Sequence, residues 1–395
     1  MKQDSFILTL DLGTTAIKAI VFDKHLKQVV RVAKEMHESR PRRGWVEQDP
    51  GEMLRLAKFV LQRAVKESGF HPASCHGLGI ANQRETTILW NKKNGRTVYP
   101  AIVWKDKRTK SLCRKLRRHE AEVREKTGLI ISPYFSAPKI QWVLEQCEEA
   151  RQLAAKGQLL FGTVDSWILW NLCEGRPHVT DQTNASRTLL YNIRTFGWDT
   201  ELLSLFRVPE SILPSVLPSQ AAFGSLKKGI LGSAIPVKAV IGDQQASVYA
   251  AISAETPSKN ATKVTFGTGT FIAQTLDNGF SLQKDFFTTL APGKHGPIYI
   301  AETKIDHGGL EAEPILHQPK KLERFFFHLA RHVDRALKKL PVKPHRIVVD
   351  GGVSRDGILP SIQASVSKIT VQHLPIFDGT SYGTALLVRD VQRKS

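Results

Sequence analysis

The chain opens with Phe6-Ile-Leu-Thr-Leu-Asp11-Leu-Gly13-Thr14-Thr15-Ala-Ile-Lys18-Ala-Ile-Val-Phe22-Asp23, two apolar runs joined by a short polar tip. This pattern predicts a strand, a tight turn and a second strand. Gly13 allows the backbone to approach a ligand closely, and the two threonines that follow supply hydroxyl and amide donors suited to phosphate oxygens. Asp11 lies at a strand end, where a carboxylate can hold Mg²⁺, an ion that prefers oxygen ligands.

Two further glycine turns repeat this arrangement. Thr265-Phe-Gly267-Thr268-Gly269-Thr270 follows one β-rich run, and Val349-Asp350-Gly351-Gly352 follows another. A single turn of this kind is more typical of a plain hairpin than of a binding site. Three of them in one chain favour a nucleotide gripped between two lobes.

Length and composition indicate a multidomain α/β protein. The chain has 395 residues, of which 41% are hydrophobic, enough for two or three domains with sizeable cores. No apolar stretch is long enough to cross a membrane, and the N-terminus does not resemble a signal peptide. The four cysteines are scattered, with neither metal-ligand nor disulfide spacing. We therefore expect a cytoplasmic protein.

The net charge is +19, with a dense basic cluster between Lys105 and Arg118. A positive field attracts anions such as nucleotides, and it can also indicate nucleic-acid binding. A solvated helix face is the favoured interpretation of the cluster. Steering of an anionic substrate and nucleic-acid binding remain alternatives, although no zinc finger or single-strand platform accompanies the cluster. We expect no nucleic-acid partner.

Several elements can be placed from periodicity. A strand is expected over 28–33, and Asp49-Pro50 has the pattern of a helix start. Strands at 76–80 and 88–90 continue an alternation of strands and helices to about residue 250, which is typical of the α/β class. The helix after Pro50 is expected to bury four apolar residues: Met53, Leu56, Val60 and Ala64.

A second domain is expected to start with a strand at 263–266. An amphipathic helix is predicted over 322–340, whereas residues 302–321 show no clear period. We place the domains at 1–250 and 251–395. The predicted inner face of the helix comprises Leu322, Phe325, Phe326, Leu329, Val333 and Leu337.

Five positions carry side chains suited to chemistry. Arg84 and Glu85 together could grip vicinal hydroxyls, the guanidinium donating and the carboxylate accepting, although an Arg-Glu dipeptide is more often a surface salt bridge. Asp243 follows the apolar run 237–241 and could accept a proton from an attacking hydroxyl, although an aspartate in that place is often a turn residue. Trp104 could cover the apolar face of a polyol, and Tyr134 offers a hydroxyl, but both could be core aromatics.

A polar loop at 180–188 could stabilise such a pocket without a role of its own. Taken with these residues, long segments of the chain resemble the FGGY family of carbohydrate kinases. The matching segments are Asp11–Thr15, Gly44–Pro50, Asn82–Thr87, Ala101–Thr109, Pro133–Ser136, Phe161–Trp167, Thr183–Thr188, Gly242–Ala246 and Phe266–Gly269. The resemblance covers residues 5 to about 275 closely and 345–388 more loosely.

The resemblance implies a two-lobed actin-like, ribonuclease-H-like fold with a truncated C-terminal lobe. It also implies ATP-dependent phosphorylation of glycerol with Mg²⁺, with Asp243 as the general base. The residues implied to bind the polyol are Arg84, Glu85, Trp104, Tyr134, Asp243 and Gln244. Those implied on the nucleotide side are Thr14, Thr15, Lys18, Gly267, Thr268, Gly309, Gly352 and Asp356, with Asp11 and Asp243 facing the metal.

The chain also departs from the family pattern. Lys18 stands where the family has arginine, which keeps the charge but loses the forked geometry. Asp356 stands where an asparagine is expected near the adenine. About a hundred residues of the second lobe are missing after Glu302, so Gly309 and Glu313 are matched only by gap-free counting. The fructose-bisphosphate loop of some bacterial members is also absent.

The resemblance therefore favours a kinase that phosphorylates glycerol, with three alternatives. These are a catalytically impaired polyol-binding relative with a decayed ATP lobe, a kinase of another small polyol, and a nucleic-acid-binding protein. The resemblance implies that the protein could form a homo-oligomer, but no interface can be identified from the sequence.

Overall fold

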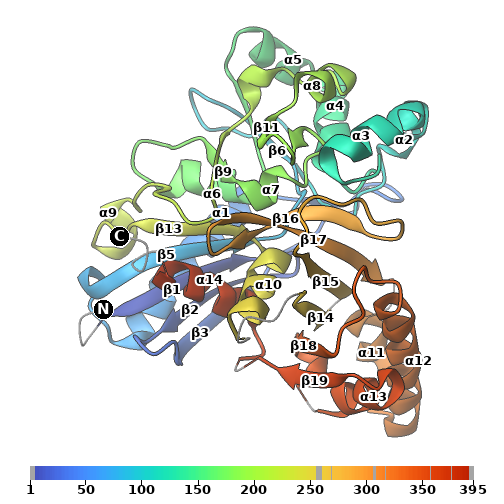
Figure 1. The fold of residues 1–395 in the computed structure, drawn as a ribbon. Coiled ribbons are helices and arrows are strands. Elements are labelled where there is room, and N and C mark those ends of the chain that lie inside the picture. Colours follow the sequence, from blue (N-terminus) through green and yellow to red (C-terminus); the bar gives the residue numbers. More distant parts are fainter. Residues whose placement is uncertain are drawn as a thin grey trace. The chain divides into compact units, whose positions relative to one another are not determined.

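A computed structural model describes residues 5–254, 260–267, 269–305, 308–315, 317–355, 357–374 and 376–390. By packing, these residues divide into two compact units (Figure 1). Unit 1 comprises the described residues up to Asp243 and those from Thr384 onward, and unit 2 comprises Gln244–Gly383. The expected boundary lay at 250/251, whereas here the chain leaves unit 1 directly after Asp243 and returns to it for the end of its last helix.

Unit 1 is built on a sheet with the strand order β13-β5-β1-β2-β3. The opening hairpin is confirmed, since β1 (Phe6–Leu12) pairs antiparallel with β2 (Ala16–Phe22), and β3 (Gln28–Glu35) completes the meander. On the other side of β1, β5 (Cys75–Asn82) and β13 (Val237–Gly242) run parallel to it. The carboxyl ends of β1, β5 and β13 therefore meet at one edge of the sheet.

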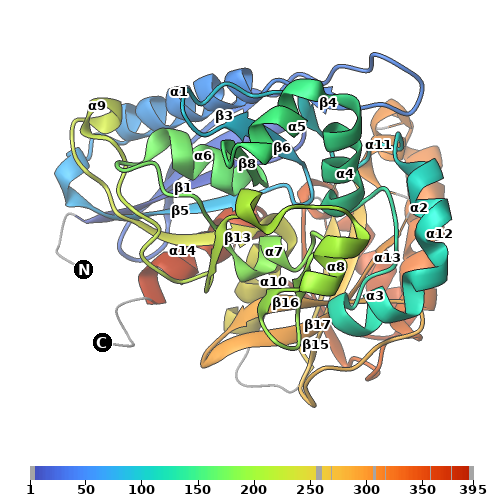
Figure 2. The ribbon, with the colours of Figure 1, turned by 90° about the horizontal axis from the view of Figure 1, so that it is seen from above.

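Helices cover both faces of this sheet. Helix α1 (Pro50–Ser68) begins as predicted, with the Asp49 side chain accepting a hydrogen bond from the Gly51 amide. Of its four expected core residues three are buried, while Leu56 is half-buried. Helix α6 (Val164–Leu172) shares the core under α1 (Figure 2). The last turns of α14 (Gly379–Asp390) lie against the opposite face, where a Cβ on Gly79 would come within 2.5 Å of the Thr384 methyl.

The remaining elements of unit 1 carry the connections around this core. The strands are β4 (Glu47–Gln48), β6 (Ile88–Asn91), β7 (Ala101–Ile102), β8 (Leu159–Gly162), β9 (Val179–Asp181), β10 (Tyr191–Asn192), β11 (Gly197–Trp198) and β12 (Ser215–Leu217). The helices are α2 (Lys110–Leu116), α3 (Glu120–Thr127), α4 (Ser136–Gln146), α5 (Glu148–Ala155), α7 (Gln182–Ala185), α8 (Thr200–Leu205) and α9 (Lys228–Leu231).

The basic cluster is mostly a solvated surface, as favoured from the sequence. Lys110, Arg114 and Arg118 are among its exposed members. Arg108 differs, because its guanidinium is buried, pairs with Glu47 at 2.8 Å and stacks 3.9 Å from the Trp45 ring. This arginine is therefore an interior anchor.

Unit 2 is built on a second sheet, in the order β16-β17-β15-β14-β18-β19. Its strands are β14 (Thr262–Phe266), β15 (Thr270–Leu276), β16 (Phe287–Gly293), β17 (Gly296–Ile305), β18 (Arg346–Asp350) and β19 (Thr370–His373). Helices α12 (Pro319–Leu337) and α13 (Ile358–Ser367) lie side by side and share one core with this sheet (Figure 1). Helix α10 (Asp243–Ala254) contributes Val248 to a smaller cluster with β15, β16 and β17.

Within unit 2, the predicted amphipathic helix is confirmed but begins and ends three residues earlier than expected. Phe326, Leu329, Val333 and Leu337 are buried, while Leu322 and Phe325 are half-buried. The stretch without periodicity continues β17 to Ile305 and then forms the short helix α11 (Gly309–Ala312) and a 3₁₀ turn. Short elements of this kind give no periodic signal, which explains why the sequence could not place them.

Candidate functional site

The carboxyl edge of the unit 1 sheet gathers the predicted site residues of this unit. In the strand register, Asp11 of β1 and Ile241 of β13 both lie level with Ala81 of β5, which runs between them. Two interstrand spacings separate β1 from β13, about 10 Å. Asp243 follows Ile241 by two residues, so Asp11 and Asp243 belong to one edge of one sheet.

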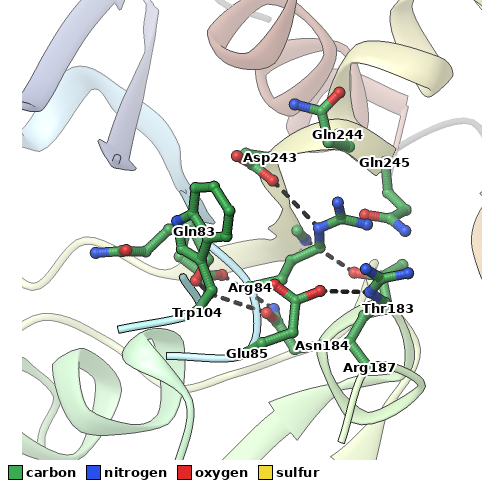
Figure 3. Close-up of polar contacts among 12 residues, drawn as sticks. Gln83, Arg84, Glu85, Trp104, Thr183, Asn184, Arg187, Asp243, Gln244 and Gln245 are labelled. Atoms are coloured by element: carbon green, nitrogen blue, oxygen red, sulfur yellow. Dashed lines mark hydrogen bonds and ion pairs between the residues drawn. The ribbon is translucent and has the colours of Figure 1, made fainter. Parts of the chain in front are cut away.

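Asp243 is held by an arginine. Its carboxylate lies 3.3 Å from the Nε atom of Arg84, whose side chain is 3% exposed, while that of Asp243 is 30% exposed. Figure 3 shows the Arg84 guanidinium directed toward Asp243. The buried guanidinium orients this carboxylate, and the exposed fraction leaves part of it accessible to a ligand.

Glu85 points to a different partner from Arg84, its neighbour in the chain. Its carboxylate accepts a hydrogen bond from the Nε atom of Arg187 at 2.5 Å, and both side chains are almost fully buried (Figure 3). The Arg-Glu dipeptide is therefore not the surface salt bridge that was the main alternative. It directs one cation and one carboxylate into the interior at the end of β5.

Two aromatic side chains stand beside this pair in unit 1. The rings of Trp104 and Tyr134 are 5.5 Å apart with an interplanar angle of 75°, and both are half-buried. The Trp104 indole donates a hydrogen bond to the Thr14 hydroxyl at 2.8 Å. Trp104 thus connects the aromatic wall to the Gly-Thr turn after β1, and neither ring is a fully buried core residue.

The Gly-Thr turn itself is shaped by tight local contacts. The Gly13 amide donates to Ala16 O at 3.1 Å, and a Cβ on Gly13 would come within 2.9 Å of the same oxygen. The Thr14 carbonyl oxygen also accepts a hydrogen bond from the side-chain amide of Gln48 at 2.7 Å. The Thr15 side chain is exposed. Lys18 forms an ion pair with Asp11 at 2.7 Å, through one nitrogen and one oxygen.

A network of buried polar side chains holds the ends of β5 and β13 in place. Thr183 Oγ1 donates to Asp181 at 2.7 Å and accepts from the Gly242 amide at 2.8 Å, which fixes the residue before Asp243. The side chains of Asn184 and Asn82 exchange two hydrogen bonds, at 2.9 and 3.0 Å, which fix the end of β5. The loop that the sequence left without a role therefore positions both strand ends.

Burial perturbs Asp181 of this network and the nearby carboxyl group of Asp165, which accepts hydrogen bonds from Thr163 and Thr180. Desolvation raises the pKa of Asp165 to about 6, with a further contribution from the neighbouring Asp181. Desolvation also raises the pKa of Asp181, against five hydrogen bonds that favour its ionised form, from Thr183, Asn184 and Ser219. Both side chains are 0% exposed, which is the cause of these shifts.

Two charged residues of the site, Arg187 and Lys139, were not predicted from the sequence. Both are fully buried charged residues that contact Glu85, Arg187 through its carboxylate and Lys139 through its carbonyl. Both contacts are long-range, since Arg187 is 102 residues and Lys139 is 54 residues from Glu85. A signal existed only for the loop around Arg187, where Asp181 followed by Thr183 and Asn184 is typical of a capping turn.

The described residues of unit 2 that were predicted on the nucleotide side lie at two glycine turns and one short helix. Because β14 runs parallel to β18, the turns that follow them share an edge of the second sheet. Gly351 has φ 99°, and a Cβ there would come within 2.4 Å of Phe266 O, so glycine is required where the turns meet. Gly267 and Gly352 belong to these turns, and Gly309 begins α11. Thr268 and Asp356 lie outside the described residues.

Gln244 lies in unit 2, unlike the other residues expected to bind the polyol. Its side-chain amide oxygen accepts hydrogen bonds from Lys263 Nζ at 3.5 Å and from Thr265 Oγ1 at 3.4 Å. Gln244 nonetheless follows Asp243 directly in α10, so the covalent chain joins the two units at the predicted base.

The residues present fit a magnesium ion in one respect. Asp11 and Asp243 supply carboxylate oxygens, which Mg²⁺ prefers, and Mg²⁺ is usually bound by one or two carboxylates together with substrate phosphates. The described part of the chain contains no group of three or more histidine, cysteine, aspartate or glutamate side chains arranged as a metal site. None of the described helices is long and apolar enough to cross a membrane.

Comparison with known proteins agrees with this geometry. Residues 6–250 match the model of the FGGY family of carbohydrate kinases, N-terminal domain. The chain is 43% identical over 299 residues to glycerol kinase 2 of Thermotoga maritima, which covers 75% of this chain and 60% of that protein. It is 40% identical over 330 residues to glycerol kinase of Lactococcus lactis, covering 82% of this chain and 66% of that protein. The chain therefore spans about two thirds or less of the length of these relatives.

Solved structures show the same fold. The crystal structure of Plasmodium falciparum glycerol kinase with ADP superposes with a TM-score of 0.85 at 24% identity, covering 99% of this chain and 90% of that one. A ligand-bound xylulose kinase from Lactobacillus acidophilus superposes with a TM-score of 0.83 at 16% identity, with the same coverage. With its opening hairpin, its parallel strand ends and the family match over most of its length, the chain belongs to the FGGY family of carbohydrate kinases.

Proposed function

We propose that this protein transfers the γ-phosphoryl group of ATP to a terminal hydroxyl of glycerol. The observation that carries the proposal is the Arg84–Asp243 pair at the carboxyl ends of β5 and β13, with Glu85, Trp104 and Tyr134 in the same unit. The names of the curated relatives, which are 40% and 43% identical, support glycerol as the substrate.

The side chains of unit 1 suit a small polyol. Arg84 is a donor and Glu85 an acceptor for vicinal hydroxyls, and the apolar ring of Trp104 suits a carbon backbone. Tyr134 offers a hydroxyl, and Gln244 would add an amide from the start of α10. The partly exposed carboxylate of Asp243 is the group best placed to take a proton.

In the proposed reaction, Asp243 accepts the proton of the terminal hydroxyl. The glycerol oxygen forms a bond with the γ-phosphorus of ATP, and the bond from that phosphorus to the β,γ-bridging oxygen breaks, releasing ADP. The protein's tasks are positioning the reactants, taking one proton and neutralising charge. Arg84 would orient the Asp243 carboxylate through the contact of its Nε atom at 3.3 Å.

The nucleotide side rests on the Gly-Thr turns. Thr14 and Thr15, with Gly267 and Thr268, would donate to phosphate oxygens, and Lys18 keeps a positive charge nearby. Asp11 and Asp243 would hold the magnesium ion, which when bound neutralises charge on the phosphates. The residues proposed near adenosine are Gly309, Gly352 and Asp356.

The test is a coupled assay of ADP release with glycerol and ATP. Asp243→Asn should abolish turnover while glycerol binding, measured by calorimetry, persists. Asp23→Asn is the matched control, because Asp23 caps an exposed turn by accepting from His25 N and Lys27 N, and asparagine can do the same. Unchanged turnover in Asp243→Asn would rule out the base assignment.

A second candidate is a polyol-binding protein with impaired kinase activity. It is favoured by length, since the chain covers only 60% and 66% of the two relatives described above. Calorimetry separates the candidates: glycerol binding without binding of ATP or ADP at millimolar concentration supports the second. A kinase of another small polyol would show turnover with that polyol in preference to glycerol. A cytoplasmic location and a homo-oligomer belong to the same proposal.

A further inference from the structure

Glu85 has an unusual backbone conformation. Its φ angle is 63°, in the left-handed region that residues with a Cβ avoid. Such a conformation persists only when the surrounding structure holds it, and it is often found where a side chain must be aimed at a ligand. Glu85 is one of the proposed polyol-binding residues, so what holds its main chain bears on binding.

Three side chains hold the Glu85 carbonyl. It accepts hydrogen bonds from Thr87 Oγ1 at 3.1 Å, from Ser136 Oγ at 3.2 Å and from the Lys139 ammonium at 3.1 Å. The same ammonium donates to the Tyr134 carbonyl at 2.7 Å. Lys139 therefore connects the main chains of two proposed polyol-binding residues.

Lys139 is the fourth residue of α4 and is 0% exposed. Lysine is almost never buried to this extent without partners, because removing the ammonium from water is costly. The charged and titratable groups around it are the carboxylates of Glu85 and Asp106, the Cys113 thiol and the Arg108 guanidinium. Burial is the largest influence and lowers the pKa of Lys139 to about 7.

We propose that Lys139 is the positioning residue of the polyol pocket: its ammonium fixes the main chains of Glu85 and Tyr134, and glycerol affinity falls when the ammonium loses its proton. This inference rests on the proposed function. Charge-assisted hydrogen bonds are stronger than neutral ones, so the charged form holds the left-handed Glu85 more firmly than the amine does. A smaller population of the binding-competent conformation then reduces the apparent affinity.

The test is calorimetric titration with glycerol from about pH 6 to about pH 9, a range that brackets the titration of the buried amine. In the wild type, the dissociation constant should rise several-fold across this range. Lys139→Met should bind glycerol about 10- to 100-fold more weakly at the acidic end, as expected for losing hydrogen bonds from a charged donor. Its affinity should no longer depend on pH in this range.

Two further variants separate charge from packing. Lys139→Arg stays protonated throughout, so it should bind more tightly than Lys139→Met and also lose the pH dependence. Ser136→Ala removes one neutral donor from the same carbonyl, so it should weaken binding by less, about 2- to 10-fold, and keep the wild-type pH profile. If Lys139→Met does not fold, the pH dependence of glycerol affinity in Lys139→Arg and in the wild type tests the role of Lys139.

The outcomes distinguish this inference from the proposed function. Wild-type affinity in Lys139→Met, a wild-type pH profile in either Lys139 variant, or a flat wild-type profile would each overturn the role of Lys139 while leaving glycerol binding intact. Failure of the wild type to bind glycerol at any pH would overturn the proposed function, and this inference with it.

Discussion

Replacing Arg187 with methionine should destabilise unit 1 strongly. The guanidinium is 1% exposed, donates to the Glu85 carboxylate, and lies 5.4 Å from the Tyr134 ring and 5.0 Å from the Phe135 ring. Methionine keeps much of the apolar stem but leaves the buried carboxylate without this partner. Removing one member of a buried ion pair typically costs about 3–5 kcal/mol.

The assay can be confined to the unit that carries the change. All seven tryptophans precede residue 199, so intrinsic tryptophan fluorescence reports on the unfolding of unit 1. With a slope of about 2 kcal/mol/M in urea, a loss of about 4 kcal/mol lowers the midpoint by about 2 M. Glycerol affinity should fall in the same variant, because Glu85 loses its orienting partner.

The control is a pair of the same type at the surface. Arg194 pairs with Glu125, and both side chains are about half exposed, at 52% and 53%. Arg194→Met should therefore change the free energy of unfolding by about 1 kcal/mol or less. Equal midpoint shifts in the two variants would refute the reasoning, because burial would then have no bearing on the cost. Adding Glu85→Gln to Arg187→Met should recover part of the loss, since a neutral amide is cheaper to bury than a carboxylate.

Three further predictions concern other parts of unit 1. Trp104→Phe keeps a ring but loses the indole hydrogen bond to Thr14, so the glycerol dissociation constant, measured by calorimetry, should rise about 2- to 10-fold. Asp165 has a folded-state pKa of about 6 against an ordinary value of 3.8, so the folded state binds more protons between these values. Its protonation should therefore add about 1 kcal/mol to the free energy of unfolding as the pH falls from about 7 to about 5, an increment that Asp165→Asn should remove. Gly79→Ala places a methyl 2.5 Å from the Thr384 side chain and should lower the free energy of unfolding by about 1–3 kcal/mol, measured by denaturant titration.

Each of these predictions has an outcome that contradicts it. An unchanged dissociation constant in Trp104→Phe would mean that the indole hydrogen bond does not orient the ring. If Asp165→Asn kept the wild-type pH dependence of stability, another group would be responsible. Gly197→Ala is the control for Gly79→Ala, because a Cβ there meets no atom within 4 Å, and a similar loss in both would contradict the packing argument.

The sequence predicted most of what is local in this fold. The hairpin from Phe6 to Phe22, the helix start at Asp49 and the strand ends that carry Glu85 and Asp243 all follow from periods, caps and turns within about twenty residues. These patterns involve residues close together in the chain, so the elements can be predicted without knowledge of the tertiary structure.

What the sequence did not predict is long-range. The burial of Lys139 and Arg187 around Glu85 depends on segments separated by 54 and 102 residues, and no local pattern marks either side chain as interior. The role of Thr183 appears only when its hydroxyl meets the Gly242 amide, 59 residues away. The left-handed conformation of Glu85 could not be predicted either, because long-range hydrogen bonds from Ser136 and Lys139 hold its carbonyl.

The division into units bears directly on the choice between the two candidate functions. Unit 1 has its own sheet and core, and it contains five of the proposed polyol-binding residues: Arg84, Glu85, Trp104, Tyr134 and Asp243. Loss of nucleotide binding in unit 2 therefore need not affect glycerol binding.

Unit 2 is nevertheless a folded body, since its sheet keeps α12 and α13 packed against it in one core. Its two glycine turns also still meet at Gly351, where only glycine fits. Unit 2 therefore has the strand ends on which phosphate binding would rest, and this favours the kinase over a binder whose nucleotide lobe has decayed. ATP binding, measured together with glycerol binding on the same protein, is the comparison that decides between them.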